Sequence, residues 1–115
     1  MRPIRPLLIH TFAVYRPMRD SDGQGGWQQS LVELVELRGR LRPASATERM
    51  VAAQEQRHIS HVLYTEGGAD IRRGDVVVGA GLEVVVQGVR EPSRAGHHLE
   101  IDCLEVQREP AEEGS

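Results

Sequence analysis

The fold class is decided by the stretch Val76-Val-Val-Gly-Ala-Gly-Leu-Glu-Val-Val-Val-Gln-Gly-Val-Arg90. Two runs rich in valine, residues 76–78 and 82–90, flank the tight turn at residues 79–81. β-Branched runs on either side of a glycine-containing turn predict an antiparallel hairpin. Glycines this closely spaced suit short strands better than long helices. The stretch therefore predicts β-structure.

Period-two alternation extends this β pattern on both sides of the hairpin. Residues 58–65 alternate between two faces, and residues 97–106 place Leu99, Ile101 and Cys103 on one face. Side chains two residues apart share a face of a strand, so we expect these three in the core. A buried free cysteine usually acts as a small hydrophobe.

The N-terminal half contains two further strand candidates. Residues 7–16, between two prolines, alternate like a strand. Residues 27–43 are ambiguous, because their first half has helical spacing, but alternation through four pairs favours a strand over at least residues 34–42. Gly39 inside that strand predicts a bulge or a tight bend. Residues 17–26, rich in Asp, Ser and Gly, predict a flexible loop.

One segment has the signature of a short helix. Residues 43–56 contain good helix formers, and either Ser45 or Thr47 can cap the N-terminus. Glu48 follows Ser45 by three residues, as in a capping box. About two turns of helix are marginal in isolation, so we expect a short helix within a long loop.

The chain as a whole therefore predicts an all-β protein of about six antiparallel strands, with long loops and one short helical insertion. Such strands must close into a small barrel or pack as a sandwich to remove their edges. A chain of 115 residues has room for one domain, which we place at residues 5–107. Residues 108–115 are acidic and small, and predict a flexible C-terminal tail.

Composition excludes several classes of protein. The chain is 39% hydrophobic and 27% charged, as in ordinary folded domains, and no apolar run approaches the length of a membrane span. All 14 basic residues are arginine, yet 17 acidic residues leave a net charge of −3, unlike a typical nucleic-acid binder. One cysteine cannot form an internal disulfide or a cysteine-rich zinc site.

The five histidines do not predict a metal site. His58 and His61 are three residues apart, which in a strand places them on opposite faces, and the neighbours His97 and His98 also diverge. No set of nucleophile, acid and base converges in the sequence. We therefore predict no catalytic residue, no metal and no cofactor.

Arginines form the clearest surface feature. Arg38, Arg40 and Arg42 alternate on one strand face, and Arg72 with Arg73 makes a second basic spot. Arginine favours bidentate pairs with carboxylates, which indicates recruitment of an acidic protein surface. The alternative is a solvated strand face balanced by neighbouring acids. The residues alone leave both interpretations open.

The order of these features resembles the head-closure proteins of tailed phages and gene transfer agents, also called stoppers or head–tail joining proteins. The resemblance covers about residues 5–107 and rests on the order of motifs rather than on any one of them. Departures occur at Leu82 or Val84, where the family often has an aromatic residue, and at Tyr64 and His97-His98, where it has arginine. The motifs are Asp22-Gly-Gln-Gly-Gly-Trp27, Gly39-Arg-Leu-Arg-Pro43, His61-Val-Leu-Tyr64, Ile71-Arg-Arg-Gly-Asp75, Leu82-Glu-Val-Val-Val-Gln-Gly-Val89 and His97-His-Leu-Glu-Ile-Asp-Cys-Leu-Glu105.

This resemblance implies a structural protein of the virion neck and not an enzyme. Members form a sixfold or twelvefold homo-oligomeric ring, with the portal or adaptor on the head side and the tail terminator or tail protein on the other. DNA passes through the channel without sequence-specific binding, and the ring helps to retain it after packaging. Assembly would take place in the cytoplasm of the bacterial host, and no membrane is involved.

A ring needs two complementary patches on each subunit. The arginine face and an acidic surface of Glu33, Glu36, Glu100 and Glu105 could supply them, while the two long insertions, 17–26 and 43–56, could reach a neighbour. The predicted interface residues are Trp27, Arg38, Arg40, Arg42, Glu48, Arg49, Arg72 and Arg73. The alternative function, a small oligonucleotide- or oligosaccharide-binding barrel, requires stacking aromatics, for which the later strands offer only Tyr64.

Overall fold

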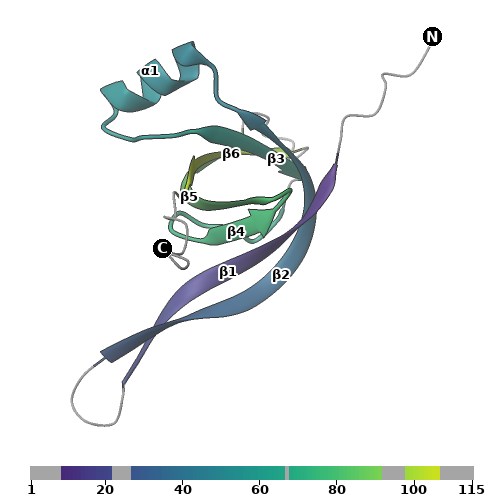
Figure 1. The fold of residues 1–115 in the computed structure, drawn as a ribbon, viewed down its shortest axis with the longest axis vertical. Coiled ribbons are helices and arrows are strands. Elements are labelled where there is room, and N and C mark those ends of the chain that lie inside the picture. The colour runs from purple at the N-terminus through teal and green to yellow at the C-terminus, as the bar shows by residue number, and fades with distance from the viewer. Residues whose placement is uncertain (1–8, 22–26, 67, 92–97, 107–115) are drawn as a thin grey trace, which may run out of the picture.

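In the computed structural model, residues 9–21, 27–66, 68–91 and 98–106 are described. Their strands form a closed antiparallel barrel in the order β1-β2-β3-β6-β5-β4 (Figure 1). The elements are β1 (His10–Ser21), β2 (Trp27–Pro43), α1 (Ala46–Gln54), β3 (His61–Glu66), β4 (Val76–Gly79), β5 (Leu82–Arg90) and β6 (His98–Glu105). The barrel with one short helix confirms the predicted fold class. The predicted tail at residues 108–115 lies outside the described residues.

Alternating side chains of all the strands fill the barrel. Leu99, Ile101 and Cys103 point inward from β6, as the alternation predicts, and burial raises the pKa of the Cys103 thiol to about 12. Ile71, in the β3–β4 connection, closes the same core. The buried set is Phe12, Val14, Leu63, Ile71, Val77, Val84, Val86, Leu99, Ile101 and Cys103. In the described part of the chain, no helix is long and apolar enough to cross a membrane.

The β1–β2 pair is longer than the sequence indicates. β1 continues to Ser21, which lies opposite Trp27, so the prediction of a loop is wrong for residues 17–21, and residues 22–26 are outside the described part. β1 pairs with β4 only through residues 13–15, and beyond them it keeps one unpaired edge, where a proline is tolerated. The pair projects from the barrel as a ribbon (Figure 1), and the molecule measures 62 × 39 × 31 Å.

The bulge predicted at Gly39 lies elsewhere. The β1–β2 register shifts at Leu34, which is the extra residue of β2, whereas Gly39 pairs regularly with His10 and Thr65. Gly39 serves a close approach instead: a Cβ there would lie 2.5 Å from the Tyr64 carbonyl oxygen. The second irregularity is at Gln87 in β5. Gly39 is therefore required by the close approach of β2 and β3, which strand periodicity does not reveal.

Gly39→Ala is expected to destabilise the protein by about 1–3 kcal/mol, because a backbone atom must move to admit the methyl group. Gly88→Ala is the matched control, since its Cβ would meet only the end of the Arg57 side chain, at 3.4 Å. That substitution should change stability by less than about 1 kcal/mol. Urea unfolding of the two variants measures the difference, and equal stabilities would contradict the steric explanation.

Helix α1 begins as predicted. Ser45 is the N-cap, its hydroxyl accepts from the Glu48 N–H at 3.1 Å, and the Glu48 carboxylate accepts from the Ser45 N–H at 2.8 Å. The helix and its flanks cover the outer face of β3 through a small cluster of Ala44, Ala52, Ile59 and Val62.

The strand predicted at residues 58–65 begins later, at His61. Ile59 packs with Val62 under the helix and not with Leu63 in the barrel, so the predicted sharing of a face is wrong. The reason is local: the Arg57 N–H still bonds the Ala52 carbonyl at 2.8 Å, and Gln56 has a φ of 62°. The chain is therefore still leaving the helix where alternation suggests a strand.

Candidate assembly surface

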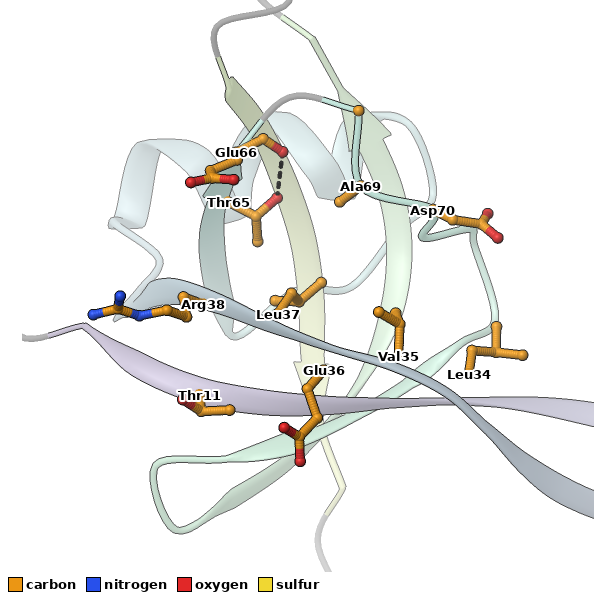
Figure 2. A pocket seen from close by; sticks show the side chains of 11 residues that line it. Thr11, Leu34, Val35, Glu36, Leu37, Arg38, Thr65, Glu66, Ala69 and Asp70 are labelled. Atoms are coloured by element: carbon orange, nitrogen blue, oxygen red, sulfur yellow. Dashed lines mark hydrogen bonds between the residues drawn. The ribbon is translucent and has the colours of Figure 1, made fainter.

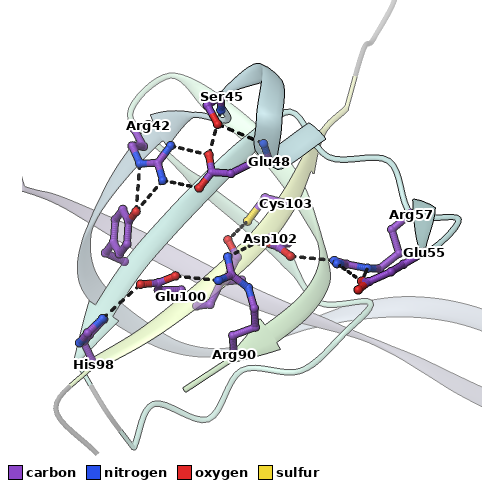
Figure 3. A network of polar contacts seen from close by, with 12 residues as sticks. Arg42, Ser45, Glu48, Glu55, Arg57, Arg90, His98, Glu100, Asp102 and Cys103 are labelled. Atoms are coloured by element: carbon purple, nitrogen blue, oxygen red, sulfur yellow. Dashed lines mark hydrogen bonds and ion pairs between the residues drawn. The ribbon is translucent and has the colours of Figure 1, made fainter. Parts of the chain in front are cut away.

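Arg42 and Glu48, two predicted interface residues, form an internal contact. The Arg42 guanidinium donates to both Glu48 carboxylate oxygens at 2.8 and 2.7 Å, and to the Tyr64 hydroxyl at 3.0 and 2.7 Å (Figure 3). Glu48 belongs at the same time to the capping box of α1. Arg42 thus ties the helix to the barrel wall, and its donors are already engaged within the subunit.

The Arg42–Glu48 contact makes stability depend on pH. The hydrogen bonds from Arg42, and next those from Ser45, lower the pKa of Glu48 to about 2 from its ordinary 4.5. The contact therefore stabilises the fold fully above pH 4.5, and this contribution is lost as the pH falls toward 2. Because the pair is partly exposed, we expect the contact to contribute about 1 kcal/mol to the free energy of unfolding.

The variant Glu48→Gln isolates this contribution. It should be less stable than the wild type at neutral pH and equally stable once the pH approaches the lowered pKa of about 2, as measured by urea unfolding across the pH range. Glu55→Gln, which removes another partly paired carboxylate near the same helix, is the control. A stability difference for Glu48→Gln that does not change with pH would contradict the assignment.

The other two arginines on this strand face, Arg38 and Arg40, are more available for contacts with a partner protein. Arg40 lies over the Tyr64 ring at 4.9 Å from its centroid, and Arg38 is exposed. Both line a shallow cavity of about 360 Å³ together with Glu66 and His98. Since Arg40 and Arg42 both lie within reach of the Tyr64 ring, this aromatic is poorly placed to stack on a base, which disfavours the oligonucleotide-binding alternative.

Two buried carboxylates, those of Asp102 and Asp75, hold distant segments of the chain together, and the sequence does not indicate this role. Asp102, 3% exposed on the outer side of β6, accepts from Arg57 and Arg90, each at 2.7 Å (Figure 3). These arginines come from the α1–β3 connection and from the end of β5. Alternation puts Asp102 on the outer face of β6, opposite to Leu99, Ile101 and Cys103, where a polar side chain is normally solvated. The structure instead buries it, because two long side chains from distant segments cover it.

Asp75 has a related role beneath the ribbon. It accepts from the Arg72 N–H at 2.8 Å, as an aspartate in a Gly-Asp turn commonly does, and also from the Arg16 guanidinium at 2.9 and 2.8 Å. Arg72 and Arg73 are both exposed on this turn, and Arg72 lies 3.5 Å from Asp70. Asp75 therefore fixes β1, at the point where it leaves the barrel, to the connection that carries the second basic spot.

A groove lies between β2 and the β3–β4 connection (Figure 2). It has a volume of about 770 Å³, and residues 34–38 of β2 form one wall while residues 65, 66 and 68–70 form the other. Leu34, Val35, Leu37 and Ala69 supply apolar surface. The charged side chains are Glu36, Arg38, Glu66 and Asp70.

Exposed apolar side chains also occur outside the groove. On the ribbon, Leu31 is 53% exposed and Val32 is 41% exposed, as is Val35 of the groove itself. On the outer side of α1, Met50 and Val51 are exposed as well. Large apolar side chains clustered at a surface typically mark contacts with other proteins.

The remaining predicted residues are scattered. Trp27 begins β2, but its side chain is not among those described, and exposed Arg49 donates to the Ala44 carbonyl at 3.1 Å. The structure thus joins Arg42 with Glu48, and Arg38 with Arg40, but leaves Arg72 and Arg73 on a separate turn. Among the described residues, no three His, Cys, Asp or Glu side chains are grouped to hold a metal ion.

Fold and surface together define a small β-barrel protein with one face and one ribbon suited to protein–protein contacts. A family model described as phage head completion protein matches residues 4–106, and the chain belongs to that family. The family is one of structural phage proteins, so the chain has a structural role in the head–tail region of a phage-type particle and does not belong to a family of enzymes.

Solved structures agree on the fold. The chain is similar to protein SF1141 from Shigella flexneri 2a, with a TM-score of 0.72, 17% identity, and coverage of 86% of this chain and 93% of that one. It is also similar to a chain from the virion of a native gene transfer agent particle, with a TM-score of 0.59, 22% identity, and coverage of 89% and 98%. No curated protein matches the sequence.

Proposed function

We propose that this protein is the head–tail connector, or stopper, of a phage or gene transfer agent particle. It forms a homo-oligomeric ring in the virion neck, between the portal or adaptor and the tail or tail terminator, and helps to retain packaged DNA. The family match over residues 4–106 carries this proposal. The likeness to a chain of a gene transfer agent virion supports it. Residues 5–107 act as one domain, and the ring assembles in the host cytoplasm.

The surface of the described barrel supports a role in a ring. A cyclic assembly uses two different patches on each subunit, because the contact is heterologous. Arg38 and Arg40 form a basic patch whose side chains are not engaged in ion pairs with the described residues, and this patch suits an acidic partner surface. Glu33 is exposed on the ribbon and is part of the acidic surface that would meet this basic patch. Glu100 is less available, since it is paired with Arg90 at 2.7 Å.

Particles made without the protein test the function. The stopper role predicts filled heads that leak DNA and lack tails in negative-stain images. Sealed, tailed particles would refute it. Complementation with Arg38→Glu/Arg40→Glu should fail to restore tailed particles, whereas Arg38→Lys/Arg40→Lys, which keeps the charge, should restore a substantial fraction. Arg42 is left unchanged in both variants, because its substitution would also loosen α1.

A further inference from the structure

Among the described residues, each of the two long strands of the ribbon has an edge that the closed barrel leaves unpaired. β2 pairs with β3 only from Gly39 to Pro43, so residues 27–38 have β1 on one side and no strand on the other. β1 pairs with β4 only from Ala13 to Tyr15, so residues 16–21 are open in the same way. An open edge carries N–H and C=O groups that can bind a further strand.

The two edges are not equivalent. Pro17 lies opposite Leu31 in the ribbon, and proline has no N–H to donate to a partner. A proline is accommodated in a strand where its nitrogen faces away from the partner, so the open edge of β1 lacks a donor at this point. Residues 30–38 of β2 contain no proline and keep every donor. Of the two edges of the ribbon, that of β2 therefore offers the complete set of N–H donors for an added strand.

The groove beside this edge has a chemical preference. Asp70 already lies near Arg16 and Arg72, at 3.4 and 3.5 Å. Glu36 and Glu66 form no ion pair with any described residue, and Leu34, Val35 and Leu37 offer apolar contacts. The charged lining is acidic on balance, since Arg38 stands against Glu36, Glu66 and Asp70. The groove therefore favours an extended segment that carries both arginine and aliphatic side chains.

We propose that the edge of β2 at residues 30–38 binds residues 2–8 of a neighbouring copy of this chain. That segment, Arg2-Pro-Ile-Arg-Pro-Leu-Leu8, has two arginines, three aliphatic side chains and no acidic residue. With Pro6 facing away, Arg5 and Leu7 can donate their N–H groups to β2, while Pro3, whose nitrogen lies on the same side as theirs, supplies no donor at the start of the segment. The seven residues of the segment span about 23 Å when extended, so they can pair along most of the open edge at residues 30–38, which is about 30 Å long.

The arm exchange would be one of the contacts between subunits of the proposed ring, and this inference rests on that ring. The arm of one subunit and the β2 edge of the next are different surfaces, so the contact is heterologous and can close into a ring. The backbone bonds would give affinity, and the groove would select side chains at alternate positions. The arm would thus add a second link between subunits beside the basic patch of Arg38 and Arg40, and the two surfaces would meet at Arg38.

Cross-linking of mixed full-length variants tests the arm exchange. Leu7→Cys protein is mixed with Val35→Cys protein and treated with a short bis-maleimide. The product of interest is the mixed dimer, which joins position 7 of one chain to position 35 of another. The matched control replaces Val35→Cys by Val78→Cys, because both valines are 41% exposed on strands. The native Cys103 is fully buried and does not compete. We expect several-fold more cross-linked dimer with Val35→Cys than with Val78→Cys.

Charge exchange provides a second measurement. Glu36→Arg/Glu66→Arg in the Val35→Cys protein should lower the yield of dimer, and Arg2→Glu/Arg5→Glu in its partner should restore it. Equal yields from Val35→Cys and Val78→Cys would overturn the arm exchange. So would a double variant, Leu7→Cys/Val35→Cys, that cross-links only within one chain. Negative-stain images of the wild type assess the ring separately: rings without the preferred cross-link refute the arm alone, and cross-links without rings refute the ring.

Discussion

Asp75→Ala is expected to lower the free energy of unfolding by about 3 kcal/mol, among the largest effects of a single substitution in this protein. The Asp75 side chain is 2% exposed and accepts charge-assisted hydrogen bonds from Arg16 at 2.9 and 2.8 Å. It also accepts from the Arg72 N–H at 2.8 Å. Its removal leaves the Arg16 guanidinium against the barrel without its main partner and opens the turn before β4.

Asp70→Ala is the matched control, because Asp70 also approaches Arg16, at 3.4 Å, but is 63% exposed. An exposed ion pair contributes little, so we expect a loss of less than about 1 kcal/mol. Urea unfolding monitored by far-ultraviolet circular dichroism measures both variants. Equal losses would show that burial of Asp75 does not set the strength of the contact. Asp75→Asn, which keeps the shape, should fall between the control and Asp75→Ala.

Leu63→Ala is expected to destabilise the barrel by about 3 kcal/mol, through lost burial and the cavity that remains. Leu63 is fully buried at the centre of β3, between Leu41 of β2 and Ile101 of β6 in the strand register. Its neighbours belong to strands of a closed barrel and are held by hydrogen bonds on both sides, so they cannot collapse far into the space.

Leu104→Ala tests whether this cost comes from the barrel interior. Leu104 is the same residue type on a neighbouring strand, but it is 37% exposed. We expect a loss of less than about 1.5 kcal/mol, because a smaller apolar area leaves water and solvent fills the gap. Denaturation midpoints should shift while the dependence on denaturant concentration stays constant. Comparable losses for the two leucines would contradict the packing described for β3.

The arginine stripe shows how structure reassigns residues that look equivalent in sequence. Arg38, Arg40 and Arg42 alternate identically, yet Arg42 alone lies beneath the start of α1 and meets Glu48. A helix that returns over the barrel creates this difference, and alternation within one strand carries no information about it. A charge-reversal experiment on Arg42 would therefore confound a lost partner contact with a loosened helix.

The same reasoning separates predictable from unpredictable parts of the candidate surface. Asp75 bonds a nearby backbone amide, which the Gly-Asp turn indicates, but its partner Arg16 is 59 residues away. Asp102 is covered by arginines 45 and 12 residues distant. A charged side chain finds such partners only when the barrel closes, so no local pattern reports them.

The sequence by itself determined the features that depend on neighbouring residues. Alternation set the inward side chains of β6, glycines set the β4–β5 turn, and Ser45 with Glu48 set the start of α1. Tertiary structure decided the rest: the length of the ribbon, the close approach at Gly39 and the open edge of β2. The physical reason is that local preferences act over a few residues, whereas strand registers and edges are fixed by hydrogen bonds between segments that meet only in the closed barrel.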